Sequence, residues 1–223
     1  MFRTHLAVFC LIFGLSISVQ SQTKTQSRTA ASQLVSYPPD VNPKYFPSGT
    51  FSNSSETDGA KDFTARWYSK HLRAMSELSL SEASKDKTLV VYRFLWLRTF
   101  HHPIAIRLTV RPDGTGSLTG KMMSGQGGYE PGRLTEKSSV EVSEQQVQGF
   151  LHLLDKTSFW ASKTEDSQPG IVNLDGAQWI LEGVQDGNYH VMDRFSPGQD
   201  DYSRTCLYLL ELSKISVPAN EIY

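Results

Sequence analysis

The sequence predicts an α+β fold, in which an antiparallel sheet made of a meander and a hairpin is packed by about three helices. Segments with helix or strand periodicity follow one another as helix, strands, helix, two strands, helix, without the alternation typical of a parallel sheet. The dipeptide Asp186-Gly187 lies between two apolar runs and is a favoured turn of a two-residue hairpin. With this order of elements, we expect the helices to cover one face of the sheet.

Residues 1–21 have the three-part order of a secretory signal peptide. Arg3 makes the start basic, an apolar run from Leu6 to Ile17 follows, and small residues lead to expected cleavage after Ser21. An uncleaved anchor is the alternative, but the apolar run is shorter than the ~20 residues that a spanning helix needs. No later stretch is long and apolar enough to span, so we expect a periplasmic or extracellular protein without a transmembrane anchor.

Composition divides the rest of the chain into a leader and a domain. Residues 22–58 are rich in Ser, Thr and Pro without helix or strand periodicity, which predicts a flexible leader in which Tyr45 and Phe46 could form a docking point. Residues 59–223 can build one sizeable core. Removal of the signal peptide leaves Cys206 alone, so no internal disulfide forms, and its apolar neighbours predict a buried thiol.

The first half of the domain predicts one helix and a set of strands. Large apolar residues at steps of four and three predict a helix over about 60–79, with Phe63, Trp67, His71, Met75 and Leu78 on its buried face. Residues 89–97 are apolar on both faces, as in a central strand. Residues 104–110 alternate like a strand with one solvated face, and further strands are expected over 115–122 and 138–142.

The second half predicts a helix, a hairpin and a last helix. Ser143 and Gln146 form a capping box in front of apolar residues with helical spacing, so a helix is expected over 144–155. The hairpin covers 177–195, and its two-residue turn pairs Ile180 with Asp193 and Trp179 with Arg194. A final helix over about 201–213 packs Cys206.

Well-specified catalytic and cofactor motifs are absent from the sequence. The glycines of SGQGGYEPG (124–132) lack the lysine and hydroxyl residue of a phosphate-binding loop, so this segment is interpreted as a flexible loop. His101 and His102 are adjacent and do not face one another on a strand. We therefore expect no cofactor and no metal ion, and the formal net charge of −1 predicts no nucleic-acid partner.

The hairpin contains the residues that best fit a chemical role. Glu182 and Asp193 share one largely apolar face as diagonal neighbours, roughly 7–8 Å apart at the backbone. Two such carboxylates can perturb one another's pKa and act as acid and base, together with a histidine such as His190. The alternative is structural: each carboxylate pairs with an arginine such as Arg93, Arg98 or Arg107 or lies at the edge of the sheet, and His190 is simply half-buried.

Candidates for ligand or partner binding lie on the same hairpin and on the earlier strands. Trp179 opposite Arg194 indicates a stacked cross-strand pair or the lining of a groove. Arg107 and Lys121, on the expected solvated face, could attract an anionic partner, and Tyr129 lies in the glycine-rich loop. A charged row on an exposed sheet is otherwise only a solvated surface.

The stretch DGAQWILEGVQDGNYHVMDRFSP (175–197), with YRFLWLRTFHHP (92–103) upstream, resembles segments of uncharacterised exported bacterial proteins. The resemblance covers roughly residues 89–213 and implies a bacterial origin, with no activity attached. The preferred interpretation is a non-enzymatic exported domain that binds a protein or a small ligand through its sheet and the 175–197 hairpin. The alternative is a hydrolase-like enzyme that uses Glu182, Asp193 and a histidine.

Overall fold

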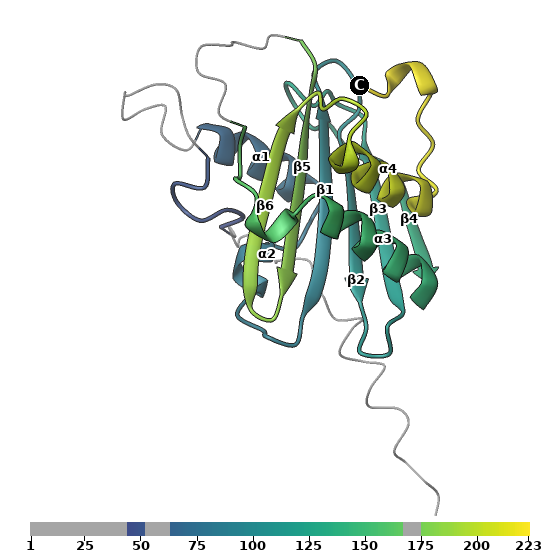
Figure 1. The fold of residues 1–223 in the computed structure, drawn as a ribbon. Helices are drawn as coiled ribbons and strands as arrows, with labels where there is room; N and C mark the ends of the chain where they lie inside the picture. The colour runs from purple at the N-terminus through teal and green to yellow at the C-terminus, as the bar shows by residue number, and fades with distance from the viewer. Residues whose placement is uncertain (1–43, 52–62, 167–174) are drawn as a thin grey trace, which may run out of the picture. The chain divides into compact units, whose positions relative to one another are not determined.

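A six-stranded antiparallel sheet organises the computed structural model of the protein, in the order β4-β3-β2-β1-β5-β6 (Figure 1). Its strands are β1 Val90–Arg98, β2 Ile104–Val110, β3 Gly116–Met123, β4 Leu134–Val142, β5 Ala177–Gln185 and β6 Asn188–Phe195. The structure describes residues 44–51, 63–166 and 175–223, which all belong to one compact unit, Val35–Tyr223. The predicted α+β fold with an antiparallel sheet is confirmed.

Strand β1 lies inside the sheet because it pairs with β2 along one edge and with β5 along the other. Strands β1 to β4 form a meander, and the β5–β6 hairpin then adds to the free edge of β1. Side chains on both faces of β1 are buried from Val91 onwards, which explains why this segment is apolar on both parities.

The β5–β6 turn fixes the register of the hairpin. Asp186 and Gly187 both have positive φ, 54° and 80°, as a type I′ turn requires. The predicted pairs, Ile180 with Asp193 and Trp179 with Arg194, are present.

One face of the sheet is covered by α3 Glu144–Lys156 and α4 Asp201–Ser213 (Figure 1). Ser143 caps α3 with the predicted capping box, and Asp200 caps α4 in the same way. Cys206 of α4 is a fully buried free thiol, as expected, and burial raises its pKa well above the ordinary value. The short 3₁₀ helices η1 Phe159–Ala161 and η2 Ala219–Glu221 follow α3 and α4.

The opposite face is covered by α1 Phe63–Ala74, by α2 Leu80–Ala83 and by residues 44–51. The expectation that helices cover one face is therefore wrong, because a central strand that is apolar on both faces requires cover on both. Residues 44–51, which composition assigned to the flexible leader, are packed here. Tyr45, Phe46 and Phe51 are buried beside α1, so the docking point is larger than expected.

The expected signal peptide, 1–21, lies outside the described residues, and so does most of the leader, 22–58. Within the part of the chain that the structure describes, no helix combines the length and apolarity needed to cross a membrane.

Candidate functional site

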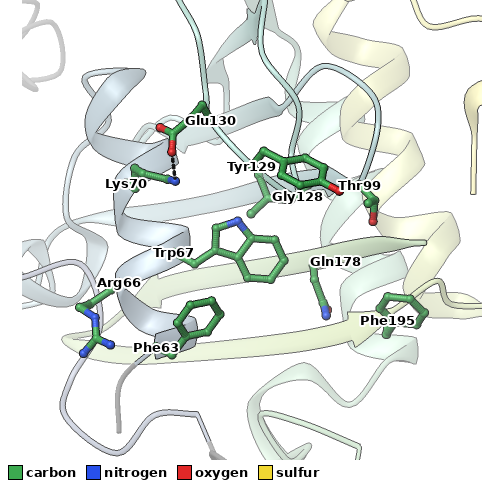
Figure 2. Close-up of a pocket in the computed structure, with 11 residues that line it drawn as sticks. Phe63, Arg66, Trp67, Lys70, Thr99, Gly128, Tyr129, Glu130, Gln178 and Phe195 are labelled. Atoms are coloured by element: carbon green, nitrogen blue, oxygen red, sulfur yellow. Dashed lines mark hydrogen bonds and ion pairs between the residues drawn. The ribbon is translucent and has the colours of Figure 1, made fainter. Parts of the chain in front are cut away.

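A pocket of about 630 Å³ opens on the face of the sheet that carries α1 (Figure 2). Three parts of the fold line it. Helix α1 forms one wall, the glycine-rich loop 124–132 forms another, and residues of β1, β5 and β6 form the floor. The pocket therefore exists only once segments far apart in the sequence have packed together.

The floor is a single row of side chains across three strands. Leu97 of β1 pairs with Gln178 of β5, which pairs in turn with Phe195 of β6, so all three project from the same face. Thr99 continues the floor beyond the end of β1, and its hydroxyl donates to the carbonyl of Gly176 at 2.9 Å. This arrangement leaves one amide, Gln178, between two apolar neighbours.

The wall formed by α1 presents Phe63, Arg66, Trp67 and Lys70 to the pocket, at spacings that place them on one side of the helix. The buried side of α1 is instead formed by Tyr68, His71 and Leu72. The predicted buried face is thus wrong at its start, because Phe63 is 60% exposed. The indole of Trp67 is held by a hydrogen bond from Nε1 to the carbonyl of Gly127, at 2.9 Å.

The second wall is the loop that was expected to be flexible, and it is fixed by backbone hydrogen bonds. Gly127 N–H donates to the carbonyl of His101 at 2.9 Å, and Gly128 N–H donates to that of Thr99 at 3.1 Å. A Cβ at Gly127 would lie 2.6 Å from backbone atoms of Arg98, so only glycine allows this close approach. The fixed loop holds Tyr129 at the pocket with 55% of its surface exposed.

The lining combines flat apolar surfaces with polar and charged side chains. Aromatic rings come from every part of the pocket except β1 and β5, namely Phe63, Trp67, Tyr129 and Phe195. Figure 2 shows the amide of Gln178 between Trp67 and Phe195, and the ion pair of Lys70 with Glu130 at the edge. Such a lining suits a ligand with a planar apolar group and one hydrogen-bonding group.

Glu182 does not reach this pocket, because Arg93 binds it from the neighbouring strand. The two residues are directly paired in β1 and β5, and Arg93 donates to one carboxylate oxygen from Nε at 2.8 Å and from Nη2 at 2.5 Å. The other oxygen accepts from the Tyr189 hydroxyl at 3.0 Å. Burial raises the pKa of Glu182, and the guanidinium of Arg93 acts against that rise. The structural alternative, a carboxylate paired with an arginine, describes Glu182.

Asp193 lies on the same face and has a different partner. The hydroxyl of Tyr68, on α1, donates to its Oδ2 at 2.7 Å. The other oxygen, Oδ1, is buried and has no hydrogen-bond partner among the described residues. Burial raises the pKa of Asp193 to about 7, although the Tyr68 hydrogen bond acts against the rise. Asp193 therefore ties α1 to β6.

The histidines are not brought to these carboxylates. His190 projects from the opposite face of β6, where its ring lies 5.0 Å from that of Phe159, and burial lowers its pKa. His101 lies in the β1–β2 loop, where Nδ1 is 2.7 Å from the hydroxyl of Tyr223. His102 Nδ1 is 3.0 Å from the carbonyl of Gly125. In the described ranges, no group of three or more His, Cys, Asp or Glu could hold a metal ion.

Trp179 and Arg194 face one another in the register but do not stack. Trp179 is buried with Phe94 and Trp96, and its Nε1 donates to the carbonyl of Tyr223 at 2.9 Å. The guanidinium of Arg194 lies over the ring of Tyr202 instead, 5.7 Å from its centroid. The prediction of a stacked Trp179–Arg194 pair is therefore wrong. The Trp179 indole is buried in the core, and α4 places the ring of Tyr202 beside the guanidinium of Arg194.

Arg107 and Lys121 are not on a solvated face, because Glu77 covers them. This buried carboxylate lies 2.8 Å from Nη1 of Arg107 and 2.6 Å from Nζ of Lys121, with Nη1 of Arg93 at 3.7 Å. Burial would raise the pKa of Glu77, but the three cations hold it below its ordinary value. The expectation of a solvated face is wrong over these residues, since the segment after α1 packs onto the sheet.

Of the predicted binding residues, Tyr129 alone lines the aromatic pocket. The sequence pattern places Phe63 and Trp67 on the buried face of a helix. Nothing in the pattern distinguishes Gln178 or Phe195 from other strand residues. The available signal was the pair of basic residues, Arg66 and Lys70, on the same side of the helix as the two aromatic rings.

Comparison of the sequence with models of protein families and with curated proteins finds no match.

Proposed function

We propose that this chain is a non-enzymatic binding domain, and that its pocket between α1 and the β5–β6 hairpin takes a ligand with a planar apolar group. The observation that carries the proposal is the exposure of large aromatic rings around one pocket. Phe63 and Tyr129 are 60% and 55% exposed, although side chains of this kind favour burial. A flat ligand that covers these rings gains the apolar contact that the folded chain leaves unused.

Gln178 supplies the polar part of the recognition. Its amide projects into the pocket (Figure 2), and it has no side-chain hydrogen bond to any described residue. An amide offers one acceptor and two donors, so it pairs well with an amide or carboxyl group of a ligand. The ligand is thus expected to combine a ring system with such a group.

A binding role is favoured over the hydrolase alternative because the groups of the acid–base hypothesis have other partners. Glu182 is held by Arg93, Asp193 accepts from Tyr68, and His190 lies on the other face of the sheet. General acid–base catalysis requires each catalytic group to lie within hydrogen-bond reach of the substrate atom whose proton it transfers, and none of these three residues is among the described lining of the pocket. We propose that export precedes this binding function, in keeping with the expected signal peptide.

The binding proposal is tested with 2-naphthamide, a planar two-ring amide, by isothermal titration calorimetry on the chain without residues 1–21. At about −0.3 kcal/mol per non-hydrogen atom, this probe is expected to bind with a Kd of about 1 mM. Phe63→Ala and Tyr129→Ala should each weaken binding about 3- to 10-fold, as expected for the loss of one ring contact.

The matched control is Trp160→Ala, which removes an exposed ring that lies beside Tyr92 and His190 on the opposite face of the sheet. It should leave the Kd unchanged. Absence of saturable binding to the folded protein, or equal weakening by Trp160→Ala and Phe63→Ala, would refute the proposal.

A further inference from the structure

The outer side of α1 carries a row of cations beside the aromatic pocket. Arg66, Lys70 and Arg73 follow at steps of four and three, so they lie along one side of the helix. Arg66 and Arg73 are exposed and Lys70 is partly exposed. The whole chain has a formal net charge of −1, so this row is a local concentration of positive charge.

A second pocket of about 550 Å³ lies against the same helix, between α1 and residues 44–48. The three cations of α1 line it, and Lys44 lines it from the opposite wall. None of the described residues that line this second pocket is acidic. Arg66 and Lys70 line both pockets, so the aromatic pocket continues into a positively charged surface.

The partners of Lys70 and Lys44 leave the positive charge of these two side chains available to a ligand. Lys70 pairs with Glu130 at 2.9 Å, but the two side chains are 41% and 79% exposed, and such surface pairs are weak. Nζ of Lys44 donates to the hydroxyl of Ser48 at 3.0 Å, a neutral partner. Arg66 and Arg73 have interactions of their own and are not vacant donors for a ligand.

We infer that the ligand of the aromatic pocket is an anion, an aromatic carboxylate whose ring system lies on Phe63 and Trp67. Its carboxylate lies on the Arg66–Lys70 side, because the ammonium of Lys70 is a stronger partner for it than the neutral amide of Gln178. This inference rests on the proposed function and adds the charge of the ligand to it. Glu130 is the single acidic residue in the described lining of the aromatic pocket, and Lys70 already pairs with it. A ligand carboxylate can replace that exposed pair with a charge-assisted hydrogen bond, whereas a ligand cation would meet Arg66 and Lys70.

The test compares three probes that share one ring system, namely 2-naphthoate, 2-naphthamide and 2-naphthylmethylamine, at pH 7.5 in 20 mM and 300 mM NaCl. We expect 2-naphthoate to bind about tenfold more tightly than 2-naphthamide at low salt, with a smaller advantage at high salt because exposed charges are screened. The amine should bind most weakly. In the double variant Arg66→Gln, Lys70→Gln, the ratio of the two dissociation constants, amide to carboxylate, should fall towards one.

The control for net charge is the double variant Lys156→Gln, Arg204→Gln, which removes two exposed cations from α3 and α4 on the other face of the sheet. It should keep the ratio of the parent protein. If 2-naphthamide binds as tightly as 2-naphthoate, or if the amine binds best, the inference fails while the proposed function stands. If no probe binds, the proposed function fails and the inference fails with it.

Discussion

Ionisation of Asp193 should make the free energy of unfolding depend on pH, and the substitution Asp193→Asn should remove this dependence. Its pKa is about 7 in the folded chain, mainly because of burial, against 3.8 as the ordinary value. Between about pH 4 and pH 7 the folded chain therefore holds a proton that the unfolded chain has lost. The free energy of unfolding falls as pH rises through this window, by about 4 kcal/mol at about 1.4 kcal/mol per pH unit.

His71 acts with the opposite sign and hides part of this effect. Burial lowers its pKa from 6.5 to about 4, so the unfolded chain binds a proton that the folded chain lacks between those values. The free energy of unfolding then rises with pH by about 3 kcal/mol from pH 4 to 6.5. The two slopes nearly cancel in the parent protein, and the contribution of Asp193 appears in the difference between variants.

Asp193→Asn replaces the carboxyl by an amide of nearly the same shape that cannot ionise and can still accept from Tyr68. At pH 4 the variant and the parent should unfold at similar urea concentrations, because both side chains are neutral. At pH 8 the variant should be more stable, by up to about 4 kcal/mol, since the parent must hold a buried carboxylate.

The measurement is urea unfolding followed by circular dichroism at pH 4, 5.5, 7 and 8. Asp155→Asn, at an exposed position of α3, is the matched control for the loss of one carboxyl group and should change the free energy of unfolding by less than about 0.5 kcal/mol. His71→Gln should expose the falling slope of Asp193 between pH 4 and 6.5. A difference between Asp193→Asn and the parent that stays constant from pH 4 to 8 would show that Asp193 is not protonated in the folded chain.

Two further predictions concern the packing around the site. Glu77→Gln leaves Arg107 and Lys121 buried without a carboxylate, so in urea denaturation it should lower the free energy of unfolding by about 3–5 kcal/mol. The control, Glu141→Gln, removes the carboxylate of the exposed pair with Arg111 and should lower the free energy of unfolding by less than about 1 kcal/mol. Equal losses in the two variants would contradict this account of Glu77. Gly127→Ala should displace the loop that holds Tyr129 and so weaken the binding of 2-naphthamide, as measured by calorimetry. The control is Gly198→Ala, whose added methyl group meets no atom within 4 Å and should leave the binding of 2-naphthamide unchanged. Unchanged binding in Gly127→Ala would mean that the loop tolerates the added methyl group.

The local parts of the fold follow from the sequence because neighbouring residues decide them. The capping box at Ser143 sets the start of α3, and the Asp186-Gly187 turn sets every pair of the hairpin. The prediction that residues 44–51 belong to a flexible leader is wrong. Their overall composition is polar, but the segment contains three aromatic side chains that are buried against α1 and the sheet. Composition averages over a segment, whereas burial depends on individual side chains.

The aromatic pocket could not be predicted in this way, since its lining depends on long-range packing. On α1, Trp67 and Tyr68 are adjacent, and the pattern alone does not say which ring faces the sheet. The hydrogen bond from Tyr68 to the buried Asp193 turns that ring inwards, and Trp67 is then left beside the loop, where Gly127 accepts its N–H. The polar contact that ties Asp193 to α1 thus also places the aromatic wall of the pocket. Loss of the Tyr68–Asp193 contact is therefore expected to disturb stability and ligand binding together, whereas loss of the ring of Phe63 disturbs binding alone.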